Sequence, residues 1–97
     1  MKQEEYLLLG KVIKTHGYQG GIQIILHPGS LGLATEILNM EVIFLKLDGI
    51  LVPFFIEISQ TVSEEMILID LQTVDTKEKA IELIGNEVYL KTSHRTA

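Results

Sequence analysis

Short aliphatic and aromatic runs, separated by turn residues at nearly regular spacing, make up most of this chain. Six of them have the length and the β-branched content of strands. They span residues 6–14, 22–27, 41–47, 50–59, 66–71 and 87–90. In the second run, Ile22, Ile24 and Leu26 share one face, while Gln23 and Ile25 share the other. The pattern predicts an all-β fold, a small six-stranded antiparallel barrel whose closure hides the strand edges.

Turn residues refine this prediction. Gly10 interrupts the first run and indicates a bulge or a tight bend. Asp48-Gly49, between the third and fourth runs, is a strong hairpin signal. Pro53 lies inside the fourth run and places its early part at an edge or a bulge. Residues 31–40 read as a loop with one helical turn.

A single helix is predicted over residues 76–84, before the last strand. Asp75 or Thr76 can cap its N-terminus, and Glu78 has the spacing of a capping-box partner of Asp75. Gly85 is the expected left-handed C-cap. The apolar residues of the helix fall on one face that we expect to be core: Ala80, Ile81, Leu83 and Ile84.

Length and composition fit one small soluble domain. The chain has 97 residues and no cysteine, which excludes disulfides, cysteine nucleophiles and cysteine-based zinc sites. No apolar run approaches the length of a membrane span. Glu4 and Glu5 precede the first apolar run, unlike a secretory signal. We therefore expect a cytoplasmic protein that does not enter a membrane.

Charge is unevenly distributed along the chain. The net charge of −5 argues against a general nucleic-acid binder. Residues 1–30, however, hold three lysines against two glutamates, whereas residues 31–97 hold five basic against eleven acidic residues. His16 and His27 also lie in the first segment. Contact with phosphate should therefore come from the first third, and the acidic remainder either keeps the domain soluble or faces a basic protein.

The segment from Gly10 to Gly20 carries the most chemical information. Gly17, Gly20 and Gly21 permit positive φ and close backbone approach, and their exposed amides could form an anion-binding concavity beside Lys14 and His16. The alternatives are a tight strand connection, in which the glycines serve geometry alone, and a site for a phosphate-bearing cofactor such as flavin. The spacing matches neither a P-loop nor a dinucleotide fingerprint, because no GK[ST] is present and no helix follows.

No catalytic or metal site emerges from the sequence. His16 as a base would need an orienting carboxylate and a nucleophile within reach. The serines stand in no nucleophile-like context: Ser30, Ser59, Ser63 and Ser93. A metal site would require three distant loops to bring His16, His27 and His94 together. We expect no catalytic residue, no metal and no cofactor.

Two segments together resemble one family. Gly10-Lys11-Val12-Ile13-Lys14-Thr15-His16-Gly17-Tyr18-Gln19-Gly20 resembles the opening strand and HGxxG turn of the ribosome maturation factor RimM family. Residues 74–90 resemble that family's acidic-capped helix, with an Ala and then Leu-x-Gly, running into a last strand. The hairpin at Asp48-Gly49 falls where the family has its central strands. The resemblance covers residues 6–91.

The resemblance implies a function by binding. Family members have an N-terminal barrel similar to the translation-factor barrel, followed by a second, PRC-type barrel. They bind the immature small ribosomal subunit, assist maturation of its head and 16S rRNA processing, and contact an S19-family protein largely through the second barrel. They are non-enzymatic and cytoplasmic. Together with the local charge, this makes six residues our candidates for ribosome contact, with rRNA as one target: Lys11, Lys14, His16, Gly17, Tyr18 and Gly20.

The sequence also departs from the family pattern. Gln19 stands where the family often has a basic residue, and Gly21 where it often has Glu. The second barrel is absent from these 97 residues. We therefore expect one barrel domain over residues 1–91 and a disordered tail over residues 92–97.

Overall fold

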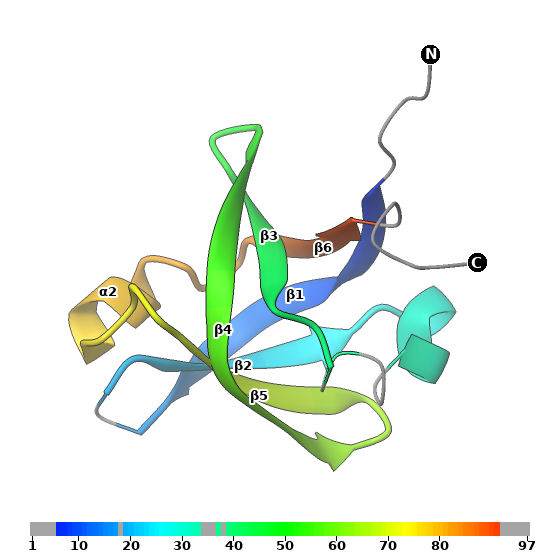
Figure 1. Cartoon of the computed structure of the whole chain (residues 1–97), viewed down its shortest axis with the longest axis horizontal. Helices are drawn as coiled ribbons and strands as arrows, with labels where there is room; N and C mark the ends of the chain where they lie inside the picture. The colour runs from blue at the N-terminus through cyan, green and yellow to red at the C-terminus, as the bar shows by residue number, and fades with distance from the viewer. Residues whose placement is uncertain (1–5, 18, 34–36, 38, 92–97) are drawn as a thin grey trace.

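The described residues form a closed antiparallel barrel (Figure 1). The structure, a computed structural model, describes residues 6–17, 19–33, 37 and 39–91. The elements are β1 (Tyr6–His16), β2 (Gly21–Leu26), the 3₁₀ helix η1 (Pro28–Leu33), β3 (Val42–Leu47), β4 (Ile50–Ser63), β5 (Met66–Leu71), α2 (Lys77–Ile81) and β6 (Glu87–Lys91). Around the barrel the strand order is β1-β2-β5-β4-β3-β6. The predicted six-stranded barrel, with one short α-helix before the last strand, is confirmed over these residues.

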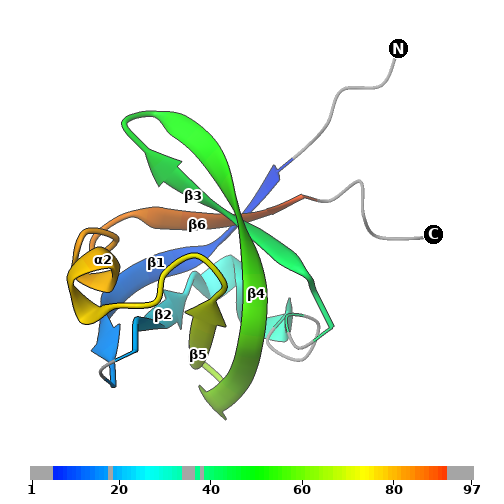
Figure 2. The same ribbon diagram turned by 60° about the vertical axis from the view of Figure 1, so that its left-hand side comes forward.

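Two long strands close the barrel. β1, of 11 residues, pairs with β6 through its first half and with β2 through its second. β4, of 14 residues, pairs with β3 over Ile50–Phe55 and with β5 over Ile56–Ser63. Both strands run further than predicted, to His16 and Ser63, because ladder pairing with β2 and β5 continues through polar residues. Figure 2 shows how strongly β4 curves between its two neighbours.

Gly10 lies where β1 passes closest to β2. A Cβ atom at this position would lie 2.0 Å from the carbonyl oxygen of Ile25. The pairing of β1 with β6 also shifts register between Leu8 and Gly10. The predicted bulge is confirmed, and its cause is a backbone contact that excludes any side chain at Gly10.

The β3–β4 hairpin has the tight turn that the sequence predicts. Asp48 and Gly49 have φ of 52° and 80° and connect the paired residues Leu47 and Ile50, as a type I′ turn requires. Pro53 pairs with β3 in the part of β4 that lacks β5 as a neighbour. The missing N–H of proline therefore costs no bond to a second strand, and the predicted edge position is confirmed.

The core fills the barrel with inward side chains from every strand. Ile22, Ile24 and Leu26 of β2 are buried, whereas Ile25 is exposed, so the predicted alternation is confirmed. Side chains from outside the strands cover the barrel's openings: Ile37, Val74, Ala80 and Leu83. The core is thus a single continuous cluster.

The α-helix is shorter than predicted. α2 covers only Lys77–Ile81, and Thr76 caps it by accepting a hydrogen bond from the Lys79 amide at 3.2 Å. Since Thr76 and not Asp75 is the N-cap, Glu78 does not stand at the capping-box position. The helix ends at its C-cap Glu82, so Gly85 is not the C-cap that the sequence predicts, although its φ of 91° is left-handed.

Half of the predicted core stripe of this helix is wrong. Ala80 and Leu83 are buried, but Ile81 and Ile84 are 49% and 41% exposed. α2 ends at Ile81 and contacts the barrel through Ala80, while Leu83 packs from the turn that follows; Ile81 and Ile84, on either side of Leu83, face outward.

A buried serine fixes the segment after β2. Ser30, within η1, donates from its hydroxyl to the Leu8 carbonyl at 2.5 Å, and its amide donates to the His27 carbonyl at 2.7 Å. The helical turn predicted within residues 31–40 thus begins earlier, at Pro28. Residues 34–36 and 38 of that prediction, and the predicted tail at 92–97, lie outside the described residues.

We predict that Gly10→Ala destabilises the barrel by at least about 2 kcal/mol, because the added methyl must displace backbone. Gly32→Ala is the matched control, since a Cβ atom at Gly32 meets nothing within 4 Å. It should change the free energy of unfolding by no more than about 0.5 kcal/mol. Urea unfolding followed by circular dichroism measures both, and equal stabilities would contradict the backbone contact.

Candidate functional site

Three cationic or titratable side chains share the outer face of β1. Lys11 and Lys14 are three residues apart, so a regular strand would place them on opposite faces. The pairing of β1 with β2, however, shifts register between Val12 and Lys14. The extra residue, Ile13, turns Lys14 outward onto the same face as Lys11, and His16 follows two positions later. All three are exposed, and we call Lys11, Lys14 and His16 the cationic strip.

The glycine turn after the strip is mostly packed against the protein itself. A Cβ atom at Gly20 would lie 2.2 Å from the Val74 carbonyl, and one at Gly21 would lie 2.6 Å from the His16 carbonyl. Gly20 is buried, which contradicts the prediction that it lies in an exposed loop. Only Gly17, with φ of 74° and nothing within 4 Å, is open to a partner. Tyr18, the remaining candidate, lies outside the described residues.

This packing bears on the alternatives for the turn. Gly20 and Gly21 serve a tight connection between β1 and β2, as the geometric interpretation holds. A Cβ atom at Gly21 would also lie 2.7 Å from the Asp70 carboxylate. A phosphate approaching Gly21 would meet that negative charge, so the geometry disfavours the flavin interpretation. Anion contact at this end of the barrel is left to Gly17 and the cationic strip.

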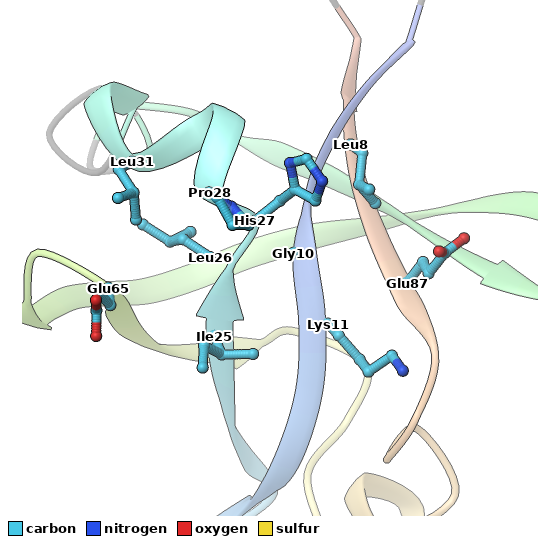
Figure 3. Close-up of a pocket in the computed structure, with 10 residues that line it drawn as sticks. All are labelled: Leu8, Gly10, Lys11, Ile25, Leu26, His27, Pro28, Leu31, Glu65 and Glu87. Carbon is cyan, nitrogen blue, oxygen red and sulfur yellow. The ribbon is translucent and has the colours of Figure 1, made fainter.

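An apolar groove adjoins the strip on the outer surface (Figure 3). Its volume is about 480 Å³. Apolar walls come from β1, β2 and η1. Figure 3 shows Gly10 on β1 near the centre, with Glu65 and Glu87 on opposite sides. Its lining includes Leu8, Gly10, Lys11, Ile25, Leu31 and Glu65.

Sequence reasoning missed this groove. The signals were Gly10 inside a strand, which indicates an irregular backbone there, and Ile25 on the polar face of β2. Neither signal alone indicates a cavity, because the groove also needs η1 to fold back beside β2.

Two ionisable side chains have shifted pKa values. The Lys79 ammonium, 3.0 Å from the Asp75 carboxylate, hydrogen-bonds it and lowers the pKa of Asp75. The pKa of Tyr89 is raised, chiefly because its hydroxyl donates to the Glu87 carboxylate at 2.9 Å. Neither side chain belongs to the cationic strip.

The histidines and serines of the sequence analysis are dispersed in the structure. His27 accepts a hydrogen bond from the Gly29 amide at its Nδ1, and Ser30 is occupied with Leu8. Within the described ranges, no three His, Asp or Glu side chains are placed to hold a metal ion. No helix there is long and apolar enough to cross a membrane. Ser93 and His94 are outside the described residues.

Comparison with known proteins assigns the family. A family model for the RimM N-terminal domain matches residues 7–95. The chain belongs to the RimM family. The predicted resemblance over residues 6–91 is therefore confirmed, and the family is one of ribosome maturation factors.

The RimM relatives share about a third of their aligned residues with this chain. The ribosome maturation factor RimM of Flavobacterium johnsoniae is 33% identical over 93% of this chain and 50% of its own length. That of Phocaeicola vulgatus is 35% identical over 92% of this chain and 49% of its own. The chain thus spans about half the length of these relatives.

Solved RimM structures have the same fold. The solution structure of the N-terminal domain of RimM from Thermus thermophilus superposes with a TM-score of 0.73 at 20% identity, covering 96% of both chains. A 16S ribosomal RNA processing protein RimM from Pseudomonas aeruginosa gives 0.72 at 17% identity, over 94% of this chain and 53% of that one. Both likenesses show that the barrel is the RimM N-terminal fold.

We predict that the Asp75 carboxyl titrates below its ordinary pKa of 3.8 in the folded protein. The ion pair therefore stabilises the fold above pH 3.8, and this contribution is lost as the pH falls through the lowered pKa. Lys79→Gln should return the pKa of Asp75 towards 3.8, whereas Lys77→Gln, on the same helix, should leave it low. Carboxyl chemical shifts measured by NMR against pH test this, and an unchanged Asp75 titration in Lys79→Gln would refute it.

Proposed function

We propose that this chain assists maturation of the small ribosomal subunit and 16S rRNA processing by binding the head of the immature subunit. It acts by binding, without catalysing a reaction, in the cytoplasm. The observation that carries the proposal is the match to the RimM N-terminal domain over residues 7–95. The names of the relatives, ribosome maturation factor and 16S ribosomal RNA processing protein, agree with it.

The cationic strip is the proposed rRNA contact. Lys11, Lys14 and His16 lie along one strand and project outward, so they can meet successive phosphates of an RNA backbone. Gly17 next to them allows that backbone to come close. Gly20 acts through the shape of the turn, and Tyr18 is included because it follows Gly17 in the sequence.

The affinity of this contact is expected to be low. Only two or three cations face the RNA, and the remainder of the domain is acidic. Binding should therefore weaken with salt at a slope of about −2 in a log–log plot. Further affinity would come from the family's second barrel and its S19-family protein, since the relatives are about twice as long as this chain.

We predict that Lys14→Glu weakens co-sedimentation of this chain with immature small ribosomal subunits by about tenfold at low salt, because it replaces attraction to phosphate by repulsion. Lys46→Glu is the matched control, since Lys46 is an exposed lysine on β3, which β6 separates from β1 in the barrel.

The double variant Lys14→Glu, His16→Ala gives the decisive result. If it keeps a dispersed amide NMR spectrum and still co-sediments normally, the turn is only a strand connector and the proposed contact is wrong. If Lys46→Glu also loses co-sedimentation, binding depends on the overall charge of the domain and not on the cationic strip in particular.

A further inference from the structure

Apolar side chains on β2, β5 and β4 lie beyond the groove, with Gln23, Gln60 and Asp70 among them. Ile25, which lines the groove and is 39% exposed, is the cross-strand partner of Met66 on β5. Leu68 lies two residues further along β5 and is half-buried. Ile58 on β4 pairs with Asp70, the next outward residue of β5, and is 56% exposed. We call the groove together with Ile25, Ile58, Met66 and Leu68 the outer apolar face.

Such a face is unusual for the solvent side of an antiparallel sheet, where polar side chains normally alternate with core residues. Outward positions of β5 should carry charge or hydroxyls, yet two of them are Met66 and Leu68. Val62, near the end of β4, adds another side chain that is 56% exposed. Exposed apolar side chains beside a groove that can take an anchoring side chain are typical of a protein contact.

The charges around the face define what can cover it. Residues 47–76, which include β4 and β5, hold six acidic residues and no Lys, Arg or His. Glu57, Glu64 and Glu65 are all exposed, and Glu65 also lines the groove. On the other side of the groove, Lys11 has Glu87 as its cross-strand partner. The positive charge of Lys11 is therefore opposed by an adjacent carboxylate and does not offset the acidic residues of β4 and β5.

This charge excludes three kinds of occupant. RNA phosphates and anionic lipid headgroups would be repelled by Glu57, Glu64 and Glu65. A second copy would bring a second set of the same acids against the first. A cationic polypeptide would be attracted, and its apolar side chains would fill the groove.

We infer that the outer apolar face binds a basic polypeptide segment. Apolar side chains of the segment pack in the groove and against Ile58 and Met66, while its Lys or Arg side chains pair with Glu57, Glu64 and Glu65. An extended segment with alternating basic and apolar residues allows both the apolar packing and the charge pairing, since its apolar side chains then all point towards the sheet. The inference goes beyond the proposed function, because it concerns the groove and side chains of β2, β4 and β5, shares only Lys11 with the cationic strip, and needs no rRNA.

The test uses the intact chain and three synthetic peptides. One alternates lysine with leucine, the second replaces its leucines by glycine, and the third replaces its lysines by glutamate. Amide chemical shifts measured by NMR map where each peptide binds. We expect the lysine–leucine peptide to shift amides of β4, β5 and the groove, with the glycine peptide at least about tenfold weaker and the glutamate peptide without effect.

Matched variants separate the apolar and the charged parts of the contact. Ile58→Lys should weaken the lysine–leucine peptide by about tenfold. Ile50→Lys, at an exposed isoleucine on the hairpin, should not. Glu57→Lys should weaken binding and reduce its salt dependence, whereas Glu78→Lys, on α2, should change neither. All four positions are exposed, so the variants should keep the dispersed spectrum of the folded chain.

Several results would overturn the inference: equal binding of the glutamate and lysine peptides, shifts confined to the cationic strip, or unchanged affinity in both Ile58→Lys and Glu57→Lys. Its failure is distinct from failure of the proposed function. Peptide binding at the outer apolar face with normal subunit co-sedimentation of the Lys14→Glu, His16→Ala variant would reject only the rRNA contact. Loss of that co-sedimentation without peptide binding would reject only the basic-segment contact.

Discussion

Closure of the barrel depends on how β1 bends past β2. β1 has to turn from its pairing with β6 to its pairing with β2 within 11 residues, and at Gly10 its backbone comes so close to the Ile25 carbonyl that no side chain fits. If β1 were straight, one of its two neighbours would lose its ladder and leave edge hydrogen-bonding groups unpaired. The mixed pairing of β4 with β3 and β5 completes the ring on the opposite side.

The same bend produces both surface features. Gly10 lines the groove, and η1, held by the hydrogen bond from Ser30 to Leu8, supplies one wall. The register shift at Ile13 then places Lys11, Lys14 and His16 on one face. The groove and the cationic strip therefore both depend on the course of β1, and Lys11 belongs to both.

Opposite charge on different strands gives the domain two kinds of surface. β1 presents lysines, whereas β4 and β5 present only acids among their charged residues. Nucleic acid would be attracted by the first and repelled by the second, and the reverse holds for a basic polypeptide. Under the two proposals, the domain presents one surface to each class of polymer.

Strand positions, the Asp48-Gly49 turn, the edge position of Pro53 and the bulge at Gly10 were all predictable from the sequence. Each follows from local rules: alternation of side chains, positive φ in a two-residue turn, and the absence of an N–H or a Cβ atom. The family, too, could be inferred from two motifs. The cationic strip was predictable in its residues, because charge content is read directly from the chain.

Tertiary structure decided the features that depend on contacts between distant segments. Periodicity could not show that a bulge at Ile13 brings Lys14 to the face of Lys11, since one extra residue reverses every later side chain. Nor could it show that Gly20 packs against Val74, or that Ile81 and Ile84 face solvent because α2 has so few residues to dock. The groove needed β1, β2 and η1 to meet, and only the closed barrel brings them together. Local sequence fixes the backbone alternatives at each position, but which face and which neighbour a residue receives is settled by the pairing of whole strands.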